Sequence, residues 1–169
     1  SNNGFDAAPA DSVAVISIKG VMMKEDMTCG PAGTATLGSM IQYADSHPNI
    51  SSIVLHIDSP GGTVDGTEAL HNIVKSVKKP VVAFVDGMMA SAALWVGSAA
   101  NEIIASTDTD MIGSCGVVMN FVDTQPYFES KGYKFHTITA TTSPDKDKMM
   151  QDLKEGNYDA YRKEHLDPL

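Results

Sequence analysis

The sequence predicts an α/β fold with a mainly parallel sheet, organised as one domain. Short runs rich in β-branched and apolar residues alternate with segments in which apolar residues recur at helical spacing. Single helices between consecutive strands are typical of βαβ units, whose right-handed crossovers make the strands parallel. The length of 169 residues agrees with the roughly 100–200 residues of an ordinary domain.

The first half of the chain shows this alternation most clearly. Residues 1–12 are polar and contain Gly and Pro, so we expect a flexible arm there. The predicted strands are short apolar runs that end at a polar residue or a turn, and they span residues 13–18, 53–57 and 81–85. The predicted helices each place their apolar residues on one face or are rich in small residues, and they span residues 36–46, 64–77 and 90–100.

The second half continues the alternation with weaker signals. A further strand is predicted to begin at residues 103–104, and short strands are expected at 115–119 and 135–139. A short helix is expected near residues 125–130, and a charged helix over 149–165 that Gly156 weakens.

The composition excludes several function classes. Asp and Glu number 21 against 12 Lys and Arg, which gives a net charge of −9. Nucleic-acid binding needs clustered Lys and Arg to displace counterions, so it is not expected. The longest basic run is Lys78-Lys79, so the chain has no basic patch for a membrane surface. With only Cys29 and Cys115 as cysteines, we expect two free thiols, no metal site and no cofactor.

The sequence contains no apolar run long enough to cross a membrane, and no signal peptide is visible at its start. We therefore expect a cytoplasmic protein. The alternative is a membrane-anchored protein whose anchor lies outside this chain.

Two loops between a strand and a helix are candidates for chemistry, because function in α/β folds collects after the carboxyl ends of strands. The first is Asp-Ser-Pro-Gly-Gly at 58–62. It lacks the Gly-Lys-Ser/Thr of a P-loop and the third glycine of a dinucleotide fingerprint. An ordinary turn and an oxyanion hole made by backbone amides both stay open. The second loop, residues 86–93, places Ser91 near the start of a helix, either as a nucleophile or as a helix N-cap.

A nucleophilic serine needs a base, and none of the five histidines is placed as in a Ser-His-Asp triad. His56 and His136 fall within predicted strands, and His71 falls within a predicted helix. A lysine can replace histidine if burial lowers its pKa. Lys146 and Lys148 are candidates, although their spacing alone favours an ordinary solvated charged loop.

Five motifs together resemble the SppA-type serine peptidases, a family that includes signal peptide peptidase A and phage head-maturation proteases. The motifs are Val-Ile-Ser-Ile-Lys-Gly at 15–20, His-Ile-Asp-Ser-Pro-Gly-Gly at 56–62, Lys-Pro-Val-Val-Ala-Phe-Val-Asp-Gly at 79–87, Ala-Ser-Ala-Ala-Leu-Trp at 90–95 and Ile-Gly-Ser-Cys-Gly-Val-Val at 112–118.

The resemblance implies a Clp/crotonase-like spiral of βαβ units and a serine endopeptidase with a Ser/Lys dyad that acts through an acyl-enzyme. It implies Ser91 as nucleophile, Lys146 as base with Lys148 as the second choice, and oxyanion donors at Gly61 or Gly62 and at Ala92. The two rival functions are a crotonase-like acyl-CoA enzyme and a catalytically silent assembly or scaffold protein.

The resemblance also implies a single peptidase domain over residues 13–169, which continues past this point in the family, so we expect a chain truncated at its C-terminus. Homo-oligomers are expected, with a peptide or protein substrate bound as an extended strand. Signal peptides and phage head proteins are the substrate types that the family suggests. Met88, Met89 and Leu94 are expected either to line the pocket for the substrate side chain or to belong to the core.

Overall fold

A computed structural model of the chain describes residues 5–168, and residues 1–4 and 169 lie outside the described part. The chain divides into two compact units, one ending at Cys115 and the other beginning at Gly116. The predicted arm over residues 1–12 lies partly outside the described residues, and within them the ring of Phe5 stacks on Tyr43 with 6.1 Å between centroids.

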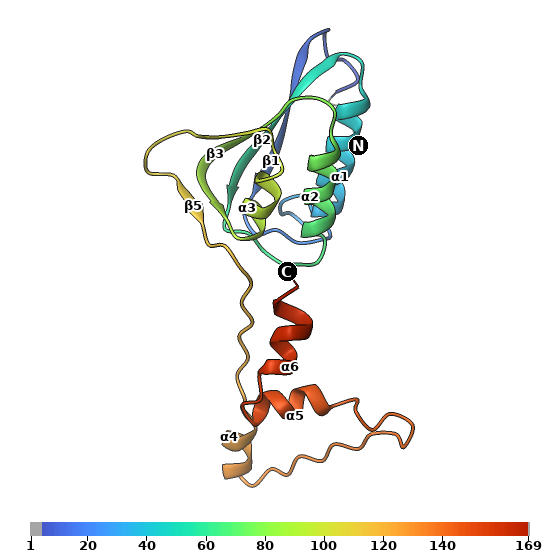
Figure 1. The fold of residues 1–169 in the computed structure, drawn as a ribbon, viewed down its shortest axis with the longest axis vertical. Coiled ribbons are helices and arrows are strands. Elements are labelled where there is room, and N and C mark those ends of the chain that lie inside the picture. Colours follow the sequence, from blue (N-terminus) through green and yellow to red (C-terminus); the bar gives the residue numbers. More distant parts are fainter. Residues whose placement is uncertain (1–4, 169) are drawn as a thin grey trace. The chain divides into compact units, whose positions relative to one another are not determined.

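The first unit contains a five-stranded parallel sheet (Figure 1). Its strands are β1 (Ser12–Lys19), β2 (Ile50–Ser59), β3 (Val81–Ala90), β4 (Glu102–Ala105) and β5 (Met111–Gly113). The first four lie in the order β1-β2-β3-β4, and β5 pairs with the far end of β3. All pairings are parallel, which confirms the predicted fold class.

Three helices accompany this sheet, namely α1 (Thr34–Ser46), α2 (Thr67–Ser76) and α3 (Ala92–Gly97). The core forms between these helices and the side chains that alternate along one face of the strands. Ile53, Leu55 and Ile57 of the central strand β2 are fully buried, and Ile41 of α1 packs into the same core. This core fixes the strand ends from which the site loops emerge.

Truncation of the core strand β2 provides a test of this packing. We expect Leu55→Ala to lower the free energy of unfolding by about 2–5 kcal/mol, because it removes a fully buried side chain and leaves a cavity. Val15→Ala is the matched control, since the Val15 side chain on the neighbouring strand β1 is 57% exposed and its loss should change stability by under about 1 kcal/mol. Urea unfolding of both variants measures the difference, and equal effects would contradict the assigned core.

The second unit consists of short helices joined by irregular segments. It contains α4 (Gln125–Ser130), α5 (Lys148–Lys154) and α6 (Asp159–Tyr161), which runs into a single π-helical turn, Arg162–Leu166. The predicted strands at 115–119 and 135–139 are wrong, because residues 116–168 form no strand. The predicted helix over 149–165 is interrupted at Gly156, which has φ +83°.

This second unit buries little apolar surface. Leu153 is the one buried hydrophobic side chain among its described residues. Phe128 instead gathers a surface cluster of rings around it, made by Tyr127, Tyr133 and Phe135. The apolar residues for which strands were predicted therefore have neither a core nor a partner strand within this unit.

Among residues 5–168, no helix combines the length and apolar character needed to cross a membrane. Cys29 and Cys115 are both free thiols, and both are exposed.

Candidate active site

Ser91 lies at the junction between β3 and α3 in a backbone conformation that is rare for a residue with a side chain. Its φ is +52° and its ψ is −120°. The residue stands at the N-cap position of α3, yet its hydroxyl makes no capping hydrogen bond. Its amide donates to the Gly113 carbonyl at 3.1 Å, and its own carbonyl accepts from Trp95 at 2.9 Å. The strained turn is therefore held by backbone bonds and leaves the hydroxyl available for chemistry.

The glycine loop after β2 packs directly against this turn. Gly61 has φ +91°, and a Cβ placed on it would lie 2.7 Å from the Ala90 carbonyl oxygen and 2.8 Å from the Cβ of Ser91. Backbone atoms cannot yield to such a contact, so only glycine fits here. The structure thus brings together Ser91 and the Asp-Ser-Pro-Gly-Gly motif, which are 30 positions apart in the sequence.

The backbone amides of this loop are not equally available. The Gly61 amide donates to the buried Ser59 hydroxyl at 3.1 Å, and that hydroxyl donates to the Gly20 carbonyl at 2.6 Å. Met22 holds the other side of the loop, because its amide donates to the Gly61 carbonyl at 2.8 Å. In contrast, the amides of Gly62 and Ala92 have no acceptor within residues 5–168.

Strand β3 bulges on its way to Ser91. Ile57 pairs with Val85, but two residues later Ser59 pairs with Met89, so β3 carries two extra residues between these pairs. Gly87 lies within the bulge and has φ +116°. Bulges of this kind re-aim the residues that follow, which here lead to the serine.

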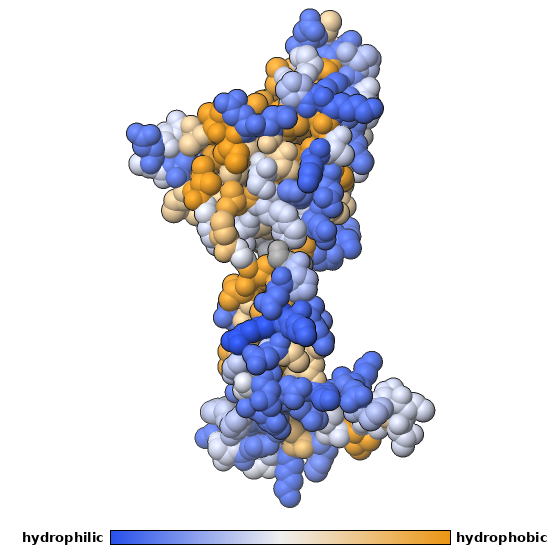
Figure 2. Space-filling model, viewed as in Figure 1, coloured by the Kyte–Doolittle hydropathy of each residue, from blue (hydrophilic) through white to orange (hydrophobic). Residues whose placement is uncertain are grey.

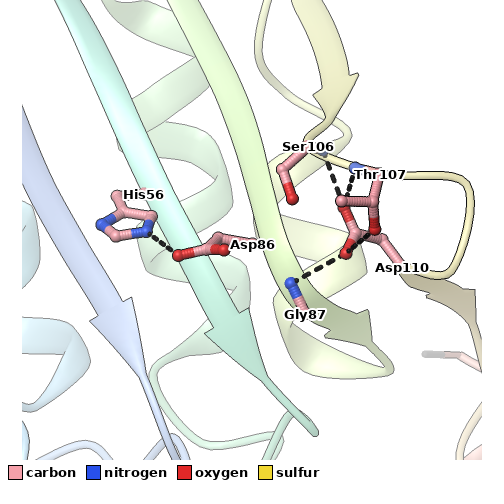
Figure 3. A network of polar contacts seen from close by, with 6 residues as sticks. All are labelled: His56, Asp86, Gly87, Ser106, Thr107 and Asp110. Atoms are coloured by element: carbon pink, nitrogen blue, oxygen red, sulfur yellow. Dashed lines mark hydrogen bonds and ion pairs between the residues drawn. The ribbon is translucent and has the colours of Figure 1, made fainter.

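Two carboxylates hold the bulge (Figure 3). Asp86 lies 2.8 Å from His56 Nε2, across the pairing of β2 and β3. The Gly87 amide donates to Asp110 Oδ1 at 3.1 Å, and Asp110 also accepts from the amides of Ser106 and Thr107. His56 lies in a strand, as predicted. The contacts of Asp86 and Asp110 carry no local sequence signal, because their partners are 30 and 23 positions away.

The other histidines and the expected pocket residues are placed as follows. His71 of α2 lies 2.7 Å through Nδ1 from the Trp95 carbonyl, so it ties α2 to α3. His136 lies in no strand, contrary to prediction. Met89 is fully buried and belongs to the core, so it does not line a pocket, whereas Leu94 packs against the core while partly exposed.

The candidate lysines belong to the second unit. Lys146 is exposed in the turn before α5, and Lys148 is exposed at the first position of α5. Lys148 also lines a cavity of about 330 Å³ together with Asp145, Asp152 and Glu164. Within the second unit, neither lysine is buried.

The parallel sheet, with a glycine loop packed on a serine turn, defines an α/β protein of the type to which Clp protease belongs. The sequence profile of the Clp protease family matches residues 16–112, and the profile of peptidase family S49 matches residues 73–164. Each of the two matches covers more than half of the chain, and the relatives that match most of it include proteases such as Protease 4. The protein belongs to peptidase family S49.

Individual relatives agree with this assignment. Protease 4 of Salmonella typhi is 36% identical over 144 residues, which cover 80% of this chain and 22% of that protein. Capsid assembly protease C of Escherichia phage lambda is 29% identical over 134 residues, which cover 76% of this chain and 30% of that protein. The chain spans between 19% and 33% of the lengths of the three first-ranked relatives.

Solved structures confirm the fold. A mutant of the 1510-N membrane-bound stomatin-specific protease superposes with a TM-score of 0.57 and 19% identity, over 73% of this chain and 59% of that one. Together with the Clp protease match, this similarity confirms the predicted Clp-like fold.

Proposed function

We propose that this chain is the nucleophile-bearing part of a serine endopeptidase in which Ser91 attacks the peptide carbonyl. The observation that carries the proposal is the strained Ser91 turn packed against Gly61, with the unbonded amides of Gly62 and Ala92 close by in sequence. Backbone amides that are fixed before the reaction stabilise the negative charge that develops on a carbonyl oxygen. Of the two glycines expected as donors, Gly62 is favoured because the Gly61 amide already binds Ser59.

The proposed reaction is acyl transfer in two steps. A neutral lysine takes the proton of the Ser91 hydroxyl, and Oγ attacks the carbonyl carbon to form a tetrahedral intermediate. The lysine then returns the proton to the leaving amine, which leaves an acyl-enzyme. The same lysine takes a proton from water as the water oxygen attacks the ester carbon. It then gives this proton to Oγ of Ser91 as the ester bond breaks, which releases the acid and restores the serine hydroxyl and the neutral lysine.

We assign the base to Lys146, with Lys148 as the second choice. A lysine is neutral near pH 7 only when it is removed from water. Both side chains are exposed, so the proposal requires another surface to cover them in the active form.

A homo-oligomer supplies such a surface. The second unit exposes large apolar side chains, among them Ile138 at 93%, Val122 at 83% and Val118 at 78%. Figure 2 shows further hydrophobic residues on the surface of the first unit, which exposes Ile103, Ile104, Met111 and Ile112. Exposed apolar surface on this scale is typical of proteins that assemble.

The proposed substrate is a peptide or protein segment bound as an extended strand, so that main-chain hydrogen bonds provide affinity. Signal peptides and phage head proteins are the two proposed substrate types, and the second agrees with the name of the lambda relative. We propose the cytoplasm as the location, or the membrane surface if a segment outside this chain anchors it.

Alanine substitution of the lysines tests the base. We expect Lys146→Ala to reduce peptide hydrolysis by roughly 100-fold or more, the usual contribution of a general base. Lys148→Ala and the exposed control Lys163→Ala should keep activity near that of the wild type. If only Lys148→Ala loses activity, Lys148 is the base. Full activity in both Lys146→Ala and Lys148→Ala would contradict a lysine base in this segment.

Labelling with a fluorophosphonate probe tests the function as a whole. The probe reacts with activated serines, so mass spectrometry of the labelled full-length protein should find the adduct on Ser91. A wild-type protein that neither hydrolyses peptides nor takes up the probe at Ser91 overturns the proposal.

A further inference from the structure

We infer that Asp110 is a positioning residue for Ser91: it clamps the bulge of β3 and so fixes the turn that presents the serine. The inference rests on the proposed role of Ser91 as nucleophile. It adds a residue that makes no contact with the substrate and acts through the backbone of β3.

The Asp110 carboxylate joins two separate segments. On its own loop, Oδ2 accepts from the amides of Ser106 at 2.7 Å and Thr107 at 3.0 Å, and Oδ1 accepts from the Thr107 hydroxyl at 3.1 Å. Across to β3, Oδ1 accepts from the Gly87 amide at 3.1 Å (Figure 3). One side chain thus closes the turn between β4 and β5 and attaches it to the bulge.

The bond to Gly87 occupies an amide that the bulge leaves outside the regular pairing of β2 and β3. An amide in that position needs a partner, and the carboxylate supplies a charged acceptor. Gly87 also has a φ of +116°, a backbone conformation that residues with a side chain rarely adopt, and a Cβ there would lie 2.8 Å from Asp58 Oδ1. The bond to Asp110 therefore holds β3 at a residue that the β2 pairing leaves free.

The segment that follows Asp110 holds the rest of the path to the serine. Met111, Ile112 and Gly113 pair with Met88, Met89 and Ala90. Gly113 then accepts the hydrogen bond from the Ser91 amide at 3.1 Å. Residues 110–113 therefore hold β3 in place from Gly87 to Ser91. Among these contacts, only that of Asp110 is made by a side chain, and the others are made by the backbone.

The chemistry requires a carboxylate at this position. Its hydrogen-bond partners, first of all the Thr107 amide, hold the pKa of Asp110 below the usual value. The group is therefore ionised at neutral pH and acts only as an acceptor. An asparagine has a single acceptor oxygen, which can serve the Ser106 and Thr107 amides but then turns its own N–H groups toward Gly87.

The test is Asp110→Asn on the full-length protein. We expect kcat for peptide hydrolysis to fall by roughly 10-fold or more, because small displacements of a nucleophile are costly. KM and the thermal midpoint should stay close to wild type, since the core and the loop turn are retained. Fluorophosphonate labelling of Ser91 should slow by the same factor, and the Gly87 amide should exchange with solvent faster by NMR.

Two variants serve as matched controls. Thr107→Val removes the hydroxyl bond to Asp110 but keeps the bond to Gly87, and Asp108→Asn removes a neighbouring charge that makes no side-chain hydrogen bond in the described structure. Both control variants should retain the wild-type kcat and the wild-type rate of Ser91 labelling. The clamp is supported when these two variants keep both values and Asp110→Asn loses them.

Three results would overturn the inference: an Asp110→Asn protein with wild-type kcat, a loss of kcat that only follows a fallen thermal midpoint, or unchanged exchange at Gly87. Failure of the proposed function differs from these, because the wild-type protein itself would then show no hydrolysis and no labelling of Ser91.

Discussion

Replacement of Ser91 by alanine is expected to abolish peptide hydrolysis, with kcat falling by about 10⁴-fold or more, as for nucleophiles of other serine peptidases. The hydroxyl supplies the atom that attacks the substrate carbonyl in the proposed reaction, whereas the backbone bonds that hold the turn do not depend on it. Circular dichroism should therefore show an intact fold. Steady-state kinetics on a fluorogenic peptide measures the loss.

Two further variants make this result specific. Ser98→Ala is the control, since Ser98 lies exposed at the end of the same helix and should keep wild-type activity. Ser91→Gly should also be inactive, but more stable than Ser91→Ala by about 1 kcal/mol, because glycine relieves a strained positive φ. An active Ser91→Ala protein would contradict the assignment of Ser91 as nucleophile. Equal stabilities of Ser91→Ala and Ser91→Gly would contradict a strained turn.

Replacement of Gly61 by alanine is expected to have the second largest effect. The added methyl group meets backbone atoms of Ala90 and Ala92 at 2.7 and 2.8 Å and adopts a φ of +91°. We expect a loss of about 3 kcal/mol in unfolding free energy from strain and contact together. The serine turn must shift to make room, so kcat should fall by roughly 100-fold even well below the melting temperature.

Gly113→Ala is the matched control for this substitution. Gly113 also borders Ser91, but a Cβ there has nothing within 4 Å, and its carbonyl bond to the Ser91 amide is kept. Its activity and stability should stay near wild type. Similar losses in both variants would show that any change beside Ser91 is harmful and would contradict the particular role given to Gly61.

The first half of the fold was predictable from sequence because its signals are local. Apolar runs such as residues 53–57 fall inside β2, and the helical spacing in residues 36–46 falls inside α1. The positions of the 58–62 loop and of Ser91 after neighbouring strands were predictable from the same alternation, because loops that follow parallel strands meet at one edge of a sheet. Their catalytic roles came from the family resemblance and stay predictions. Strand ends were less predictable: β3 runs on to Ala90, since pairing with β5 carries it past Asp86 and Gly87.

The second half was not predictable in the same way. Apolar residues at 135–139 read as a strand, but a strand needs a neighbour, and residues 116–168 offer none. The positioning role inferred for Asp110 could not be predicted for a related reason. It depends on a hydrogen bond from Gly87, which lies in a strand distant in the sequence. Lys146 lies exposed in a loop of the second unit, and no local pattern separates it from an ordinary charged loop, so its role as the base stays a prediction.

The bulge of β3 also limits how the length of this chain can change during evolution. Its two extra residues are an even number, so Met89 returns to the same buried face as Val85. A single deletion between these residues would turn every later side chain of the strand over and carry Ser91 to the opposite face. Insertions and deletions between Val85 and Ser91 are therefore expected only in pairs among related sequences that keep the serine in place.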